Sequence, residues 1–332
     1  MRFIQILVFC TITMAQMSWA IAQDLKSINI IVGFTTGGAY DLTARLWARH
    51  MGRFLSGNPQ FVVQNMPGAG SIAAANHLFN LAPRDGSVLA VIGGAVVFEP
   101  MFGNQSAKFD PQAFAWIGGR TPETALCALW HTARARNFAD LTQIDTTVGG
   151  VGPGSRTNNH PLILNALAAT KFRIVSGYPG GMEISLAMER GEVDGFCGWA
   201  WGAIKARSMN LVKESKIRLV VQTGIQKIAE LSDVPFALDL AKTEEDRAVM
   251  RVLVTDTQLA WPLVAPPGLR DSRVEELREA FDAMMKDPET LRDAAQMQLD
   301  VDPVTGRSMQ DAVAALVSQP RHIVERARMI IK

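Results

Sequence analysis

The sequence predicts an α/β protein built as two lobes, and three observations support this prediction. Short apolar runs typical of buried strands alternate with segments whose apolar residues recur at helical spacing. Glycine-rich turns join the two kinds of segment, as in sheets whose strands are connected by right-handed helical crossovers. A first set of strands and helices breaks off near residues 120–125, and a second set begins there. The second set ends near residues 256–260, where the chain resumes the first set. We therefore expect the middle set to be inserted into the first, with two crossings between them.

Residues 1–22 have the pattern of a secretory signal. Arg2 supplies a positive start, Phe3–Met14 an apolar run, and Ala20-Ile21-Ala22 a small-residue cleavage site. Cleavage after Ala22 would leave an exported, periplasmic protein, because no later segment is long and apolar enough to span a bilayer. An uncleaved membrane anchor is the alternative.

The composition of the chain limits its size class and the kinds of partner it can have. The 332 residues are 48% hydrophobic, which is enough for a sizeable core, and the length suggests two domains. The chain has 33 basic and 32 acidic residues, and removal of Arg2 with the signal leaves 32 of each. A neutral chain without a basic stripe argues against a nucleic-acid partner.

The stretch from Ile28 to Asp41, INIIVGFTTGGAYD, joins an expected strand to an expected helix. Its apolar start suits a strand buried on both faces of a parallel sheet. Gly33, Gly37 and Gly38 then open the chain, and Asp41 suits a helix N-terminus. Free backbone N–H groups at the positive end of the helix dipole can bind an anion. An ordinary turn without a ligand is the alternative.

The same arrangement recurs along the first set. A second strand at Phe61–Val63 is followed by the loop Gln64–Gly70 and a helix, and a third strand at Leu89–Ile92 ends in Gly93-Gly94. Ligands of such sheets bind at the carboxyl ends of the strands, where these glycine loops fall.

The middle set and the tail complete the pattern. The middle strands are expected at Leu126–Trp130, Thr146–Val148, Phe172–Val175, Val193–Cys197 and Ile217–Gln222. Two glycine-rich turns, GGVGPGSRTNN and SGYPGG, precede helices in this set. The return strand Leu259–Ala265 leads into helices at Ser272–Met285, Pro288–Gln296 and Met309–Ala327.

These motifs resemble the Bug family, the extracytoplasmic solute-binding proteins of tripartite tricarboxylate transporters. The first set contributes IIVGFTTGGAYD, QNMPGAGS and PRDGSVLAVIGG; the later pieces are GVGPGSRT, SGYPGG, MERGEVDG, ELSDVPFALDL and WPLVAPPG. The pieces come in the family's order over nearly the whole mature chain. Several stretches depart from its pattern. Phe34-Thr35-Thr36 is usually richer in proline, and many members have Thr-Ser-Pro-His where this chain has Arg156–His160. The GWAWGA stretch after Cys197 and the KTEEDR segment indicate a subgroup.

The resemblance implies a type II periplasmic-binding-protein (Venus flytrap) fold, with each lobe a sheet flanked by helices and two crossover strands as the hinge. Lobe one would comprise 23–123 and 258–332, and lobe two 124–257. The implied function is capture of a small organic carboxylate and its delivery to a membrane permease, by a monomer without a cofactor. A binding protein that reports to a membrane signalling partner is the alternative, and an enzyme on the same fold comes third.

In the family, main-chain amides and hydroxyls of the two signature turns hold the ligand carboxylate. Carried over to this chain, lobe one offers Thr35, Thr36, Gly37, Gly38, Ala39 and Asp41, with Gly68, Ala69 and Gly94 nearby. Lobe two offers Gly154, Ser155, Arg156 and Thr157, with Tyr178 and Gly180 on the neighbouring loop. Small residues allow close approach of backbone, and N–H groups suit an oxyanion. Turn geometry alone could explain any one glycine, and helix capping could explain Asp41.

Three larger side chains have open roles. Arg156 could pair with a second ligand carboxylate, or it could be solvated. Trp199 and Trp201 could form a wall of the cleft, and hinge or core packing is the alternative.

Cys127 and Cys197 remain after cleavage of the signal, and each lies on an expected strand of the middle set. In an oxidising compartment they could form a disulfide if the two strands are neighbours. Two buried free thiols are the alternative.

Catalytic and metal motifs are missing from the sequence. It has no G-x-S-x-G elbow, and Gly150, Gly152 and Gly154 do not meet the G-x-G-x-x-G fingerprint. The five histidines are scattered without metal-ligand spacing. We therefore expect no catalytic residues and no metal.

Overall fold

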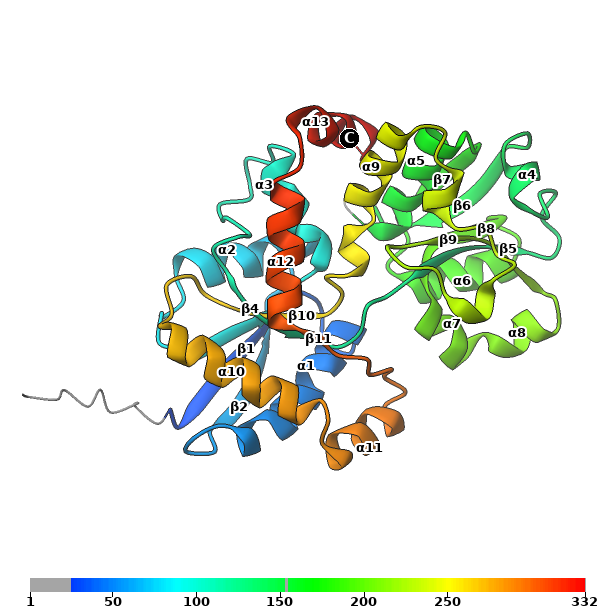
Figure 1. Cartoon of the computed structure of the whole chain (residues 1–332). Coiled ribbons are helices and arrows are strands. Elements are labelled where there is room, and N and C mark those ends of the chain that lie inside the picture. The colour runs from blue at the N-terminus through cyan, green and yellow to red at the C-terminus, as the bar shows by residue number, and fades with distance from the viewer. Residues whose placement is uncertain (1–24, 153–154, 332) are drawn as a thin grey trace, which may run out of the picture.

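The computed structural model describes residues 25–152 and 155–331. The expected signal, residues 1–22, and Gly154 lie outside this range. The described residues form two mixed sheets, each flanked by helices (Figure 1). This confirms the two-lobed α/β fold that the sequence predicts. Within the described part of the chain, no helix is long and apolar enough to cross a membrane.

The first lobe is built on a six-stranded sheet of order β11-β4-β10-β3-β1-β2. Its strands are β1 (Ser27–Val32), β2 (Gln60–Asn65), β3 (Val88–Val91), β4 (Ala115–Gly119), β10 (Pro262–Ala265) and β11 (Val304–Thr305). Strands β1, β2 and β3 are parallel, as the strand–helix alternation predicts. Strand β10 is antiparallel to both β3 and β4. It runs the opposite way because the chain re-enters the lobe at the same end of the sheet at which β4 leaves it.

Helices cover both faces of this sheet: α1 (Ala39–His50), α2 (Ile72–Asn80), α3 (Phe98–Met101), α10 (Asp271–Met284), α11 (Pro288–Gln296) and α12 (Gly306–Val317). Short 3₁₀ turns occur at Met51–Phe54, Ala69–Ser71 and Gly94–Val97. The apolar residues of β1 are buried, including Ile28, Ile30 and Val32. Trp47 of α1 meets Phe281 of α10 edge to face, with ring centroids 5.2 Å apart. These contacts fix α1 against the sheet and therefore fix the direction of its N-terminus.

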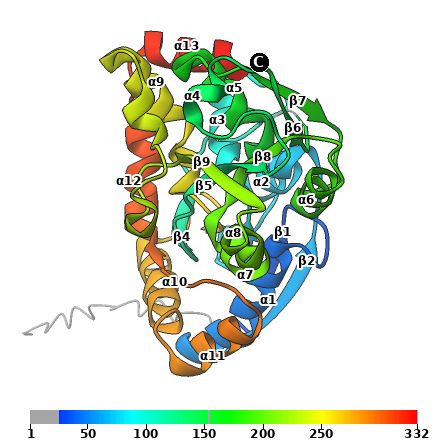
Figure 2. The same ribbon diagram turned by 90° about the vertical axis from the view of Figure 1, so that its right-hand side faces the viewer.

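The second lobe is built on a five-stranded sheet of order β7-β6-β8-β5-β9. Its strands are β5 (Ala125–Trp130), β6 (Thr146–Gly150), β7 (Phe172–Ser176), β8 (Gly195–Ala200) and β9 (Ile217–Thr223). Its helices are α4 (Phe138–Leu141), α5 (Arg156–Ala168), α6 (Gly181–Glu189), α7 (Trp201–Arg207), α8 (Met209–Lys213) and α9 (Glu244–Leu253), with 3₁₀ turns at Ala229–Leu231, Ala237–Leu240 and Thr255–Thr257. Figure 2 shows α7 and α8 on the side of this lobe that faces the viewer.

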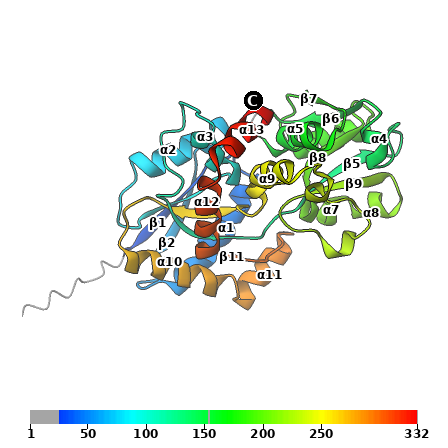
Figure 3. The same ribbon diagram turned by 45° about the horizontal axis from the view of Figure 1, so that its top comes forward.

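In the C-terminal segment after α11, the structure differs from the single helix expected over Met309–Ala327. The structure has two helices here, α12 and α13 (Arg321–Ile331), which are separated at Pro320. Proline lacks a backbone N–H and disfavours helical conformation in the residue before it, so the helix ends there. Helix α13 then packs against α9 and α5 of the second lobe (Figure 3). The expected lobe boundaries at 123/124 and 257/258 stay predictions.

The two segments that join the lobes lie side by side. The register of β4 and β10 places Gly119 opposite Pro262, so the chain leaves and re-enters the first lobe at neighbouring points. Beyond the sheet, the backbone N–H of Glu123 donates to the carbonyl of Thr257 at 2.8 Å. We call residues 120–124 and 254–261 the crossing segments below.

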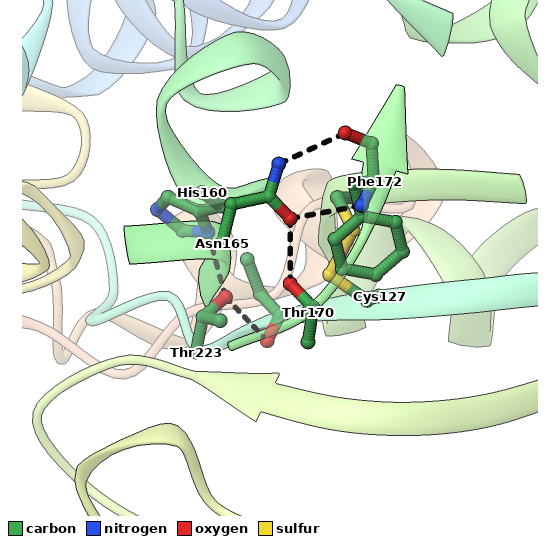
Figure 4. The surroundings of a disulfide bond; sticks show 8 residues. Cys127, His160, Asn165, Thr170, Phe172 and Thr223 are labelled. Carbon is green, nitrogen blue, oxygen red and sulfur yellow. Dashed lines mark hydrogen bonds between the residues drawn. A yellow bond between two sulfur atoms is a disulfide. The ribbon is translucent and has the colours of Figure 1, made fainter. Parts of the chain in front are cut away.

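A disulfide joins Cys127 of β5 to Cys197 of β8, with Cα atoms 3.9 Å apart. The two strands are antiparallel neighbours in the second sheet, as the disulfide requires. Figure 4 shows its surroundings: Asn165 bonds the backbone of Phe172 and the hydroxyl of Thr170. Both cysteines are buried, so the bond lies inside the lobe that carries α5.

Replacing both cysteines by alanine should lower the free energy of unfolding by about 2–4 kcal/mol, because the bond closes a long loop and constrains the unfolded chain. Urea unfolding of the variant and the wild-type protein, each with and without dithiothreitol, measures this. Dithiothreitol should destabilise the wild-type protein and leave the variant unchanged. Equal stability of the two proteins under oxidising conditions would contradict the prediction.

Candidate functional site

The main cleft of the described structure has a volume of about 1760 Å³ and is lined by both lobes and both crossing segments. The lining includes the N-terminal ends of α1 and α5. Ten of the residues expected to bind ligand line it: Gly37, Gly38, Ala39, Ala69, Gly94, Ser155, Arg156, Thr157, Trp199 and Trp201. Six do not: Thr35, Thr36, Asp41, Gly68, Tyr178 and Gly180.

The first turn presents backbone rather than side chains to the cleft. Gly37 adopts a φ of +82°, in the left-handed region that favours glycine. Gly38 is the N-cap of α1 and supplies no side chain to bond the amides that follow. The first amides of a helix have no partner within the helix, so they are available to an acceptor in the cleft. The hydroxyl of Thr36 instead donates to Asn65 at 3.1 Å.

Asp41 holds this turn together from inside. Its carboxylate accepts the N–H of Gly37 at 2.8 Å, Nε of Arg45 at 2.9 Å and Nδ2 of Asn65 at 3.0 Å. Burial would raise the pKa of Asp41, but these three donors outweigh it and lower the pKa. Asp41 is buried and lies outside the lining of the cleft, so it holds the first turn in shape and does not face the cleft.

The second turn is also held by its own side chains. Oγ1 of Thr157 accepts the N–H of Val151 at 2.9 Å, and Oγ of Ser155 donates to the carbonyl of Gly152 at 2.6 Å. The two hydroxyl oxygens lie 2.9 Å apart. Because these groups bond within the turn, a ligand would meet mainly the backbone N–H groups at the start of α5.

Gly198 of β8 allows this turn to lie close to the second sheet. A Cβ atom there would lie 2.7 Å from the carbonyl oxygen of Arg156, and the φ of Gly198 is +74°. The next residue, Trp199, stacks on Phe196 at 4.8 Å, and Trp201 donates from Nε1 to Glu230 at 2.5 Å. Both tryptophans are therefore fixed by packing and also line the cleft.

Arg156, the first residue of α5, connects the second turn to both crossing segments. Its Nη1 lies 2.7 Å from Glu123 on the first segment, and its Nε lies 3.0 Å from Asp256 on the second. The side chain is 18% exposed. These contacts leave the expected pairing with a ligand carboxylate without support, because two carboxylates of the protein already neutralise the guanidinium.

We call the group formed by Arg156, Glu123, Asp256 and His160 the Arg156 cluster. Contacts within it shift the pKa values of its members. Burial would raise the pKa of Asp256, but Arg156 and His160 together lower it to about 2. Nδ1 of His160 contacts the hydroxyl of Thr223 at 2.6 Å, and its Nε2 lies 3.9 Å from Asp256. Burial lowers the pKa of His160, so the ring is neutral at physiological pH and Arg156 is the main counter-ion of Asp256.

A column of stacked side chains, which the sequence analysis missed, forms another wall of the cleft. Phe34 stacks on Tyr40 at 4.0 Å, Tyr40 lies 4.4 Å from Trp261, and the guanidinium of Arg120 lies 4.6 Å from the centre of the Trp261 indole. All four residues line the cleft. Arg120 and Trp261 belong to the crossing segments, which the sequence marked as hinges and not as a binding surface.

One group of side chains in the described range has metal-ligand spacing: His50, Asp287 and Glu289, with atoms within 4.8 Å of one another. Arg53 lies among them and contacts Asp287 at 2.8 Å, Glu289 at 2.5 Å and His50 at 2.9 Å. A guanidinium already balances these acids, so the group is an ion-pair network that ties η1 (Met51–Phe54) to α11.

Comparison with known proteins finds a sequence relative and solved structures of similar fold. No protein-family model matches the chain. A curated relative, described as the UPF0065 protein in the gbd 5′ region of Cupriavidus necator, is 26% identical over 316 residues. The match covers 91% of this chain and 87% of that protein.

Three solved structures share the fold. A TctC solute-binding protein from Polaromonas has a TM-score of 0.67 at 17% identity, covering 90% of this chain and 98% of its own. The periplasmic binding protein BugD has a TM-score of 0.64 at 18% identity, with coverage of 91% and 97%. R. palustris Rpa4515, solved with adipate, has a TM-score of 0.66 at 18% identity, with coverage of 91% and 97%.

The resemblance to the Bug family is confirmed. The chain has the fold of Bug and TctC solute-binding proteins over nearly all of its described length. The TctC and BugD structures are both described as binding proteins.

The Arg156 cluster predicts a pH-dependent contribution to stability. Because the pKa of Asp256 is depressed from 3.8 to about 2, its contribution is present above pH 4 and is lost as the pH falls towards 2. Asp256→Asn should therefore lower the free energy of unfolding at pH 6 by about 2 kcal/mol. Urea unfolding between pH 2 and pH 6 should show this difference shrinking in acid. Asp233→Asn, at an exposed position, is the control; a pH-independent difference at Asp256 would refute the assignment.

Proposed function

We propose that the protein is a periplasmic solute-binding receptor that captures a small organic carboxylate between its two lobes and delivers it to a tripartite tricarboxylate-type permease. The observation that carries this proposal is the pair of helix N-termini, those of α1 and α5, that line one cleft. Each supplies backbone N–H groups and the positive end of a helix dipole.

The chemistry of the two turns favours an anion over a cation. Asp41, Ser155 and Thr157 bond within their own turns, so the polar groups left for a ligand are mainly N–H donors. Donors of this kind suit a carboxylate, since hydrogen bonds to an ionised acceptor are about twice as strong as neutral ones. The adipate in the Rpa4515 structure, which has the same fold, is consistent with such a ligand.

Export, the monomeric state and the permease partner are parts of the proposal that follow from the sequence pattern of residues 1–22 and from the family resemblance. The adjacent crossing segments suit a hinge, so we propose that the lobes close on the ligand by rotation about residues 120–124 and 254–261.

The ligand class can be tested by thermal denaturation of the mature chain with mono-, di- and tricarboxylates, amines and uncharged sugars. A ligand that binds only the folded protein raises the melting temperature, by several degrees at concentrations about 100 times its dissociation constant. We expect the largest shifts from carboxylates. Larger shifts with an amine or an uncharged sugar would overturn the proposal.

The role of the α1 amides can be tested by Ala39→Pro. Ala39 is the first residue of α1, where proline is tolerated, and the extended Gly38 before it (φ −75°, ψ 168°) is compatible with a following proline. The change removes one N–H from the cleft and leaves the helix intact. Calorimetry with the best carboxylate from the panel should show about tenfold weaker binding or more.

The matched control is Asp271→Pro, at the first residue of α10, which also follows an extended residue (φ −65°, ψ 139°) and lies outside the lining of the cleft. Its affinity should match that of the wild-type protein. If the two proline variants bind alike, the α1 amides do not hold the carboxylate.

A further inference from the structure

Arg120 differs from the other charged residues of the cleft. The side chain follows β4 on the first crossing segment and is only 5% exposed. Among the described residues it forms no salt bridge, and its Nε has no hydrogen-bond partner. Nη1 donates to the backbone carbonyl of Asp300. A cation in this state has lost most of its water and has gained one neutral acceptor in exchange.

The other cations that line the cleft are balanced or solvated. Arg156 has two carboxylates within 3.0 Å. Lys205 and Arg207 are exposed to water. Among the described lining residues, Arg120 is therefore the buried cation that still lacks an anion.

The carboxylates nearest to Arg120 do not neutralise its positive charge. Glu123 lies on the same segment and is already bound to Arg156 at 2.7 Å. Asp300 offers its backbone carbonyl, and neither its carboxylate nor that of Glu123 lies within ion-pair distance of Arg120 in the described structure. Since burying an unpaired charge is unfavourable, the fold retains Arg120 at a cost in stability.

Trp261 is the aromatic neighbour of the Arg120 guanidinium. The guanidinium lies over the Trp261 indole, 4.6 Å from the ring centre, in a cation–π arrangement. Trp261 is 8% exposed and has a φ of +56°, a strained conformation for a residue other than glycine. Strain of this kind persists where surrounding structure enforces it and is common at ligand sites. The indole Nε1 also lacks a hydrogen-bond acceptor among the described residues.

The stacked column links this position to the first binding turn. Tyr40 lies between Trp261 and Phe34, and it is the second residue of α1, directly after Ala39. The turn amides and Arg120 therefore belong to one continuous wall of the cleft, separated by two aromatic side chains, Tyr40 and Trp261.

We propose that Arg120 binds a second oxyanion of the ligand, at the end of the cleft beside the crossing segments, while the two turns hold the first carboxylate. This inference rests on the proposed function, because it assumes that a carboxylate occupies the turns. The ligand would then be a dianion, with two carboxylates or one carboxylate and another oxyanion, joined by a short chain along the aromatic column. The planar guanidinium suits such a group, because its N–H donors match the geometry of a carboxylate.

The test compares acids that differ by one carboxylate: butyrate with succinate, pentanoate with glutarate, and hexanoate with adipate. Dissociation constants are measured by calorimetry on the mature wild-type chain, Arg120→Gln and Arg120→Lys. Arg207→Gln, which removes an exposed cation of the same cleft, is the matched control.

In the wild-type protein, one dicarboxylate should bind at least about tenfold more tightly than its monocarboxylate, since a charged hydrogen bond to a buried donor is strong. Arg120→Gln should abolish this preference and leave monocarboxylate affinity within about twofold. Arg120→Lys should retain part of this preference, because lysine keeps the positive charge but lacks the planar N–H donors of the guanidinium. Arg207→Gln should retain all of it.

Each outcome decides between the two proposals. If monocarboxylates bind and no dicarboxylate binds better, the inference about Arg120 fails and the proposed function stands. A preference that survives in Arg120→Gln also overturns the inference. If no acid of either kind binds the wild-type protein, the proposed function fails and the inference fails with it. Should Arg120→Gln not fold, the wild-type comparison and Arg120→Lys still decide the question.

Discussion

The contact on which the arrangement of this cleft most depends is the double ion pair of Arg156. One guanidinium at the start of α5 binds Glu123 on one crossing segment and Asp256 on the other. It therefore fixes the second binding turn relative to both connections between the lobes. Such buried pairs contribute little net stability, since desolvation offsets attraction, but removal of one partner is costly. Their main effect here is geometric, because they hold the second turn and the start of α5 against both crossing segments.

The side chains of the two turns serve a similar purpose at shorter range. Asp41 accepts the N–H of Gly37, and Thr157 accepts that of Val151, so polar side chains are used to hold backbone in place. The N–H groups at the two helix starts remain for the ligand. Backbone amides cannot change their charge and hardly move, which makes them a preorganised site for an oxyanion. Under the proposed function, selection among anions would come from other parts of the wall, such as Arg120 and the tryptophans.

Much of the fold could be predicted because local pattern determines it. Apolar runs such as Ile28–Val32 and glycine turns such as Gly37–Gly38 specify strands and helix starts from near neighbours alone. Local pattern says less about where single side chains point. Asp41 and Tyr178 lie in signature turns but outside the lining of the cleft. Asp41 is buried and accepts hydrogen bonds from its own turn, a tertiary arrangement that its place in the sequence does not reveal. The single helix expected over 309–327 is two helices, the first ending at Val317, and the signal that separates them, Pro320, is present in the sequence.

The sequence by itself determined the two-lobed α/β architecture, the glycine turns and the family resemblance, since these depend on residue order and spacing. Only the tertiary structure decided which charges are paired. Glu123, Arg156 and Asp256 are far apart in the sequence, and their contacts exist because the two crossing segments lie side by side at the start of α5. The unpaired state of Arg120 is also a tertiary feature. Glu123, the carboxylate nearest to Arg120 in the chain, is bound by Arg156. The burial of Arg120 depends on packing between distant segments, which no local sequence pattern encodes.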